Sequence, residues 1–156
     1  MMLTTSDFVT STIADTKPLS LVRGLDGPDR DLLIAGTAEA PIAIILEGEF
    51  AHQHFKASGS EHWDGLIIPN LRVEVDDTSA FDARAIRNPV GSVVRTASEL
   101  ALLVQNKPPM GLGRICLETG LADMGQHSVG FYRWQLVRGE GQGKQVFRIF
   151  DVSPHE

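Results

Sequence analysis

The run P-I-A-I-I-L-E-G-E-F-A-H-Q-H-F-K (residues 41–56) decides the fold, together with L-I-I-P-N-L-R-V-E-V-D-D (residues 66–77), which follows a polar loop. In the first run, the even positions beyond its start carry apolar residues and two histidines, and the two glutamates occupy odd positions. Alternation with a period of two is typical of a β-strand that buries one face. We therefore predict one strand over residues 42–56, bent at Gly48, and another over residues 67–75.

Further strands are indicated by short apolar runs between turn residues. They lie at residues 31–36, 91–95 and 114–118. The first of these precedes the long run closely enough for the two to form a hairpin. The sequence is therefore rich in strand patterns from residue 31 onward.

The C-terminal part shows the strongest hairpin pattern. Two β-rich runs, residues 129–138 and 144–152, are joined by G-E-G-Q-G. Aromatic and β-branched side chains paired across the two strands would stabilise them. We predict that Trp134 and Phe147 are substantially buried there, and that Phe147 and Ile149 share a face.

One segment favours a helix. Thr96-Ala97-Ser98-Glu99 fits a capping box, in which the threonine and glutamate side chains satisfy the first backbone amides. A helix over about 97–105 is predicted, and a strand L-A-L-L-V is the competing interpretation. The fold class is thus mainly β, a small single-domain β-barrel or β-sandwich with one minor helix near 97–105. Residues 1–30 are predicted as an N-terminal arm or loop packed on the domain, and residues 31–156 as a single β-rich domain.

Charge is unevenly distributed along the chain. The formal net charge is −6 over 156 residues. Acids dominate residues 39–82, whereas bases dominate residues 130–150. Four bases in the second region are too few for a nucleic-acid footprint, so no nucleic-acid partner is expected. The two regions are either solvated faces of opposite sign or complementary patches that meet between subunits.

The cellular setting is predicted from what the sequence contains. Cys116 is the single cysteine, so no disulfide forms within the chain and a reducing compartment is expected. The N-terminal residues lack the charged and apolar regions of a signal peptide. No apolar run approaches the length of about 18 residues that a membrane span needs. We expect a cytoplasmic protein without a membrane partner.

Histidines at the end of the long run suggest a candidate site. His52 and His54 are two residues apart, so on one strand both imidazoles would project from the same face. Glu61 and His62 follow in the polar loop, which can fold back to supply further ligands for a divalent transition metal. Phe50 and Trp63 are the predicted ligand-binding residues beside them. A solvated strand end is the competing interpretation of these histidines.

Two functions remain open from the residues alone. The first is a small soluble β-domain that binds a small molecule or a divalent metal at the cluster of His52, His54 and His62. The second is a non-catalytic, homo-oligomeric interaction or structural module that self-associates through strand edges. No pattern assigns catalytic residues, so the sequence does not decide whether the protein is an enzyme.

Overall fold

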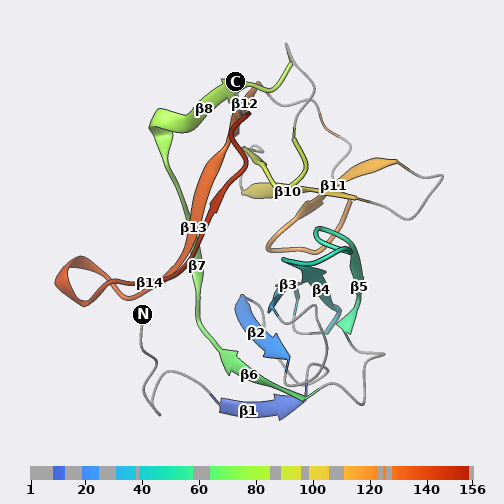
Figure 1. The fold of residues 1–156 in the computed structure, drawn as a ribbon, viewed down its shortest axis with the longest axis vertical. Helices are drawn as coiled ribbons and strands as arrows, with labels where there is room; N and C mark the ends of the chain where they lie inside the picture. Colours follow the sequence, from blue (N-terminus) through green and yellow to red (C-terminus); the bar gives the residue numbers. More distant parts are fainter. Residues whose placement is uncertain are drawn as a thin grey trace.

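The structure is a computed structural model of the chain. It describes residues 9–12, 19–24, 31–37, 39–57, 64–84, 89–95, 99–105, 111–122, 125 and 128–154. The described chain is mainly β, as predicted, and its strands form three antiparallel sheets (Figure 1). The sheets are open and do not close into a barrel, so the sandwich-like alternative holds.

The largest sheet has six strands in the order β1-β6-β2-β3-β4-β5. Its strands are β1 (Val9–Thr12), β2 (Ser20–Gly24), β3 (Asp31–Gly36), β4 (Pro41–Ile45), β5 (His54–Lys56) and β6 (Asp64–Ile68). The predicted hairpin of residues 31–36 with the following run is confirmed as β3–β4. Two strands come from the predicted N-terminal arm, and β2 lies between β6 and β3. The proposed domain boundary at residue 30 stays a prediction.

The other two sheets have five and three strands. The five-stranded order is β11-β10-β9-β12-β8, formed by β8 (Ala80–Asp82), β9 (Val93–Arg95), β10 (Leu100–Gln105), β11 (Leu112–Cys116) and β12 (Val129–Phe131). The three-stranded order is β14-β13-β7, formed by β7 (Arg72–Val75), β13 (Arg133–Arg138) and β14 (Gln145–Asp151). Two 3-10 turns, η3 (Asp77–Ser79) and η4 (Gly141–Gly143), complete the described elements.

The helix predicted near 97–105 is wrong from Leu100 onward, because that segment is strand β10 between β9 and β11. Ala101, Leu102 and Val104 are fully buried, so successive residues face apolar surroundings on both sides of the sheet. A strand buried on both faces appears in a sequence as a continuous apolar run and has no period of two. Residues 96–98 of the capping box lie outside the described residues.

The single strand predicted over residues 42–56 is also wrong. The run folds back on itself as the hairpin β4–β5, in which Ile44 pairs with His54. Gly48 lies in the turn with φ +83°, which agrees with the predicted bend, and His52 has φ +68°. Such left-handed backbone is readily adopted by glycine, and His is among the residues enriched there. The alternation of apolar and polar residues continues through the turn, so the sequence pattern does not reveal where the chain reverses.

The predicted strand 67–75 divides between two sheets. Strand β6 ends at Ile68, and β7 begins at Arg72 in the three-stranded sheet. Pro69, Asn70 and Leu71 separate them, and Asn70 has φ +61°. Proline has no backbone donor for a sheet ladder, and a positive φ breaks the extended strand. This corner carries the chain from the six-stranded sheet to the three-stranded sheet (Figure 1).

The C-terminal hairpin is confirmed as β13–β14. Trp134 is 1% exposed, as predicted, and Phe147 is partly buried against the core. A register shift between Leu136 and Val137 changes the facing of β14. Phe150 therefore lies opposite Trp134. Ile149 is 69% exposed whereas Phe147 packs against the core, so the predicted common facing of Phe147 and Ile149 is wrong.

One core joins the three sheets. Its buried members include Leu33 and Ile44 from the six-stranded sheet, Leu102 from the five-stranded sheet, and Trp134 and Leu136 from the three-stranded sheet. A second cluster contains the alternate residues of β2–β4 and therefore lies on the opposite face of that sheet; it comprises Val22, Leu32, Ile34, Ala43, Ala57 and Ile67. No helix in the described residues has the length and apolar character that would let it cross a membrane.

Candidate functional site

The two described histidines lie in and just after the β4–β5 turn. The His52 amide donates to the Ile45 carbonyl at 2.6 Å, and the Gln105 amide donates to the His52 carbonyl at 3.0 Å. These bonds attach the turn to the end of β10. His54 is the first residue of β5 and is partly buried. The backbone of His52 is therefore fixed both by the neighbouring strand β4 and by β10, which is distant in the sequence.

The imidazole of His52 packs against Gly91. A Cβ atom added to Gly91 would lie 2.7 Å from the His52 Nε2 atom, so a larger residue there would collide with the ring. Gly91 also has φ +88°, a backbone conformation that other residues rarely adopt. Burial, and secondarily the charge of Arg148, lower the pKa of His52 from its ordinary value of 6.5. The neutral imidazole is therefore the favoured form in the folded protein.

The free energy of unfolding should decrease as the pH is lowered, because of His52. Its pKa is lower in the folded than in the unfolded chain, so the unfolded chain binds the proton more readily as pH drops through about 6.5. We expect the free energy of unfolding of wild type to decrease between pH 7.5 and 5.5 by more than that of His52→Asn. Asparagine tolerates the positive φ. Urea unfolding at the two pH values measures the difference, and equal decreases would refute the role of His52.

The metal site stays a prediction. Its further ligands, Glu61 and His62, and the predicted ligand-binding residue Trp63 lie outside the described residues. Within the described part of the chain, no group of three or more His, Cys, Asp or Glu side chains lies close enough together to hold a metal ion. Phe50 is in the same turn and is 47% exposed. The structure thus places His52, His54 and Phe50 in one short segment.

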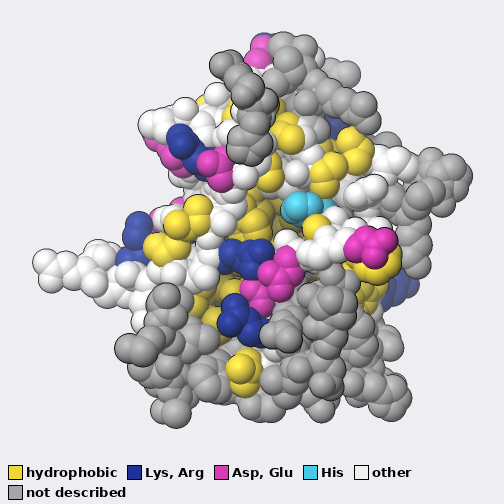
Figure 2. All heavy atoms as spheres, in the orientation of Figure 1, with side chains coloured by type: hydrophobic (Ala, Val, Ile, Leu, Met, Phe, Trp, Pro, Cys, Tyr) yellow, Lys and Arg dark blue, Asp and Glu magenta, His cyan; other side chains and the backbone are white. Residues whose placement is uncertain are grey.

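A charge cluster around the buried Asp31, which no sequence pattern marked, lies on one face of the protein. Asp31 has a side chain that is 4% exposed. It accepts hydrogen bonds from Arg23 Nε at 2.9 Å and from Arg148 Nη1 at 2.5 Å, and Arg148 lies 3.5 Å from Glu47. Figure 2 shows basic side chains on either side of acidic ones near the middle of one face, with a histidine above them. Two positive and two negative charges balance in this cluster.

The cluster connects separate sheets. Arg148 belongs to β14 of the three-stranded sheet, whereas Asp31 begins β3 of the six-stranded sheet. The Arg148 guanidinium also lies over the Phe150 ring, 5.3 Å from its centroid. Because the Asp31 carboxylate is already engaged by two arginines, we assign the cluster a structural role. No sequence signal marked Asp31, since an acid before an apolar strand is usually solvated.

Other opposite charges also pair within the chain. Lys144 contacts Glu74 at 3.0 Å, and Arg133 contacts Asp76 at 3.1 Å. The hydrogen bond from Lys144 is the largest cause of a lowered pKa at Glu74. These pairs join the basic C-terminal region to the acidic middle region that the sequence analysis distinguished. Some of the opposite charges that could have paired between subunits therefore pair within one chain.

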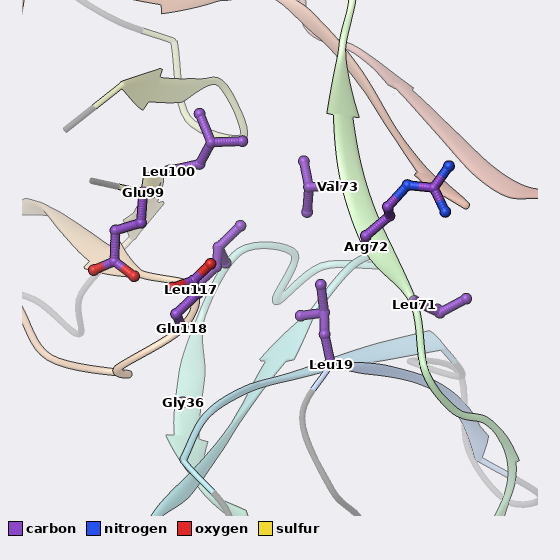
Figure 3. A pocket seen from close by; sticks show the side chains of 9 residues that line it. All are labelled: Leu19, Gly36, Leu71, Arg72, Val73, Glu99, Leu100, Leu117 and Glu118. Carbon is purple, nitrogen blue, oxygen red and sulfur yellow. The ribbon is translucent and has the colours of Figure 1, made fainter. Parts of the chain in front are cut away.

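A cleft lies where the three sheets meet. It has a volume of about 440 Å³. Its lining residues come from all three sheets and the segments that flank them: Leu19, Gly36, Leu71, Arg72, Val73, Glu99, Leu100, Leu117 and Glu118. Leu19, Val73 and Leu100 extend toward the space between the sheets (Figure 3). No local sequence pattern marks this cleft, because its walls are separated by up to about a hundred residues in the chain.

Hydrogen bonds and a close glycine contact position the cleft walls. The Leu71 amide donates to the Leu19 carbonyl, and the Leu117 amide donates to the Leu100 carbonyl, both at 3.0 Å. The Gly36 amide donates to the Leu117 carbonyl at 2.9 Å. A Cβ atom on Gly36 would lie 2.9 Å from the Ala40 carbonyl oxygen, so the end of β3 needs glycine there. The cleft is thus part of the hydrogen-bonded framework.

Charged side chains occupy the margins of the cleft. Glu99 and Glu118 lie along one wall, next to Leu100 and Leu117 (Figure 3). The guanidinium of Arg72, on the other wall, points away from the centre (Figure 3). It contacts Glu74 at 3.1 Å. The described cleft therefore combines an apolar interior with an acidic margin.

These features define a small, mainly β, sandwich-like protein with a cleft between its sheets. Within that class, the chain belongs to the family described as uncharacterised protein y4lG, which matches residues 10–156. A relative, uncharacterized protein y4lG of Sinorhizobium fredii, is 36% identical over 146 residues, which cover 93% of this chain and 91% of the relative. No solved structure matches the chain.

Proposed function

We propose that the protein is a small-molecule-binding β-domain whose ligand occupies the cleft between the three sheets. Ligand sites in proteins are concave, largely apolar and commonly about 300–1,000 Å³ in volume. The cleft of about 440 Å³ falls in that range. The single observation that carries the proposal is that five apolar side chains line it, from strands β7 and β10 and from the segments next to β2, β7 and β11, namely Leu19, Leu71, Val73, Leu100 and Leu117.

The geometry favours this cleft over the histidine segment as the ligand site. The turn that contains Phe50 and His52 supplies few described side chains, and the imidazole of His52 is packed against Gly91. The cleft, in contrast, has walls fixed by backbone hydrogen bonds. A metal at His52, His54, Glu61 and His62 remains the narrower proposal from the sequence. Self-association through the opposite charges loses support because Arg133, Lys144 and Arg148 pair with acids of the same chain, whereas self-association through strand edges stays a prediction.

Binding of a neutral apolar dye tests the proposal. N-phenyl-1-naphthylamine carries no charge at pH 7 and becomes fluorescent in apolar surroundings. We expect wild type to enhance its fluorescence saturably, and Val73→Trp to weaken binding at least tenfold by filling the cleft. Leu100→Phe, a smaller change on the opposite wall, provides a second variant if the first folds poorly. Circular dichroism of each variant verifies that the strands are retained.

The matched control is Ile149→Trp, which introduces the same side chain on the same sheet. Ile149 is 69% exposed and lines a second cleft of about 400 Å³, together with Glu74, Asp76 and Arg133. We expect this variant to bind the dye as wild type does. Loss of binding in Ile149→Trp with retention in Val73→Trp would place the dye in the second cleft and overturn the proposal. Absence of saturable binding to wild type would also overturn it.

A further inference from the structure

We propose that the ligand of the cleft is a short, extended peptide with apolar side chains, whose backbone pairs with the outer edge of strand β7. This inference rests on the proposed ligand-binding function and specifies its ligand class. An apolar lining alone would accept any apolar molecule of suitable size. The backbone of β7 adds hydrogen-bonding groups to the cleft, and these groups favour a peptide over a hydrocarbon.

Strand β7 has a partner strand on one edge only among the described residues. It is the last strand in the order β14-β13-β7, so β13 pairs with its inner edge. In an antiparallel pair, successive residues direct their backbone groups alternately toward the partner and away from it. The Asp76 amide donates to the Arg133 carbonyl at 3.0 Å, so the even-numbered residues of β7 face β13. Val73 and Val75 therefore direct their amides and carbonyls to the outer edge.

This outer edge borders the cleft. The Leu71 amide, which precedes Val73 in the same alternation, donates to the Leu19 carbonyl at 3.0 Å, and all three residues line the cleft (Figure 3). Among the residues that the structure describes, none accepts a hydrogen bond from the Val73 amide or donates one to its carbonyl. Backbone groups in apolar surroundings are costly to leave without partners. A ligand that supplies both a donor and an acceptor at Val73 is therefore favoured.

A peptide supplies both groups in the spacing of a strand. One residue of the ligand can accept from the Val73 amide and donate to the Val73 carbonyl, as in other complexes formed by strand addition. The side chains of that residue and its neighbours then contact the apolar lining. The Leu19 carbonyl already occupies the edge at Leu71, so the ligand begins beyond that point. At a rise of about 3.3 Å per residue, a peptide of two or three residues covers the remaining edge.

Capped dipeptides with the same side chains separate backbone pairing from apolar burial. The parent probe is N-acetyl-Leu-Leu-N-methylamide, and in each of two analogues an ester oxygen replaces the N–H of one leucine. An ester keeps the extended shape but cannot donate a hydrogen bond. Binding to the full chain is measured by isothermal titration and by competition with N-phenyl-1-naphthylamine. We expect the parent to displace the dye, and the ester that lacks the donor to the Val73 carbonyl to bind at least fivefold more weakly.

The variant Val73→Pro removes the amide donor of the protein. Proline is tolerated on an edge strand where the N–H points away from the partner, so the ladder with β13 should be retained. We expect this variant to weaken peptide binding at least tenfold and to affect the dye less. Val75→Pro makes the same change on the same edge at a residue that does not line the cleft, and it should bind the peptide as wild type does. Circular dichroism verifies that both variants retain their strands.

The outcomes separate this inference from the proposed function. Equal affinity of the parent and both esters for wild type, with the dye still bound, would overturn the inference alone, and this comparison needs no variant to fold. Equal loss of peptide binding in the two proline variants would overturn the role of Val73. A wild-type dimer that Val73→Pro converts to a monomer would assign the edge to a second copy of the chain and overturn the inference. Failure of both the peptide and the dye to bind wild type would overturn both proposals.

Discussion

Replacing Trp134 by alanine is expected to lower the free energy of unfolding by about 3–5 kcal/mol, the range typical of large buried aromatic residues. Trp134 is 1% exposed. Its ring stacks on Phe150, with centroids 3.9 Å apart and an angle of 11° between the ring planes. Its indole Nε1 atom donates to the Gly91 carbonyl at 2.8 Å. The residue therefore links β13, β14 and the turn before β9.

Two further variants separate the parts of this effect. Trp134→Phe keeps an aromatic ring but removes the donor for the Gly91 carbonyl, and we expect a loss of about 1–3 kcal/mol. Ile149→Ala, on the neighbouring strand, changes an exposed residue and should alter stability by no more than about 0.5 kcal/mol. Urea unfolding with an unchanged slope measures all three variants. A Trp134→Ala midpoint equal to that of Ile149→Ala would contradict the packing described above.

Asp31→Ala should produce the second large effect, a loss of about 3 kcal/mol. Removing one partner of a buried ion pair typically costs about 3–5 kcal/mol, because the other charge is left uncompensated. We place this case at the low end of the range because Arg148 keeps Glu47 at 3.5 Å and the Arg23 side chain is 58% exposed. Urea unfolding at pH 7 measures the loss.

The interpretation of Asp31 can be checked with an apolar replacement and a surface control. Asp31→Leu combined with Arg148→Met removes both charges, and we expect it to regain much of the stability that Asp31→Ala loses. Arg84→Ala breaks a pair with Asp82 whose side chains are 68% and 47% exposed. That change should cost no more than about 1 kcal/mol. If Asp31→Ala costs no more than Arg84→Ala, the charge cluster around Asp31 does not stabilise the fold.

Local patterns identified much of the strand content. The run Asp31–Gly36 is bounded by turn residues and became β3, and the hairpin around G-E-G-Q-G became β13–β14. Both elements form between neighbours in the sequence, so hydrophobic spacing and turn residues carry enough information to predict them. The burial of Trp134 followed from the same pattern. The position of Gly48 as a bend was also visible, because glycine within a strand pattern favours such a site.

Other features depended on contacts between distant segments. The apolar run of β10 has no period of two, and its neighbours β9 and β11 make it a strand. The division of residues 42–56 into two strands was concealed because alternation records the face of each residue and not the direction of the chain. The facing of β14 was decided by a register shift opposite Leu136 and Val137. Each of these outcomes depends on pairing that local propensity does not encode.

The sequence by itself determined that the protein is mainly β, where most strands lie and that the histidines His52 and His54 belong to one short segment. Only the tertiary structure placed Arg148 against Asp31, which is 117 residues away in the chain, and assembled the cleft from three sheets. The physical reason is that the partners of an ion pair and the walls of a cleft come from segments that are distant in the sequence. These segments become neighbours only when the chain folds. In the sequence, their residues cannot be distinguished from ordinary surface charges and core leucines.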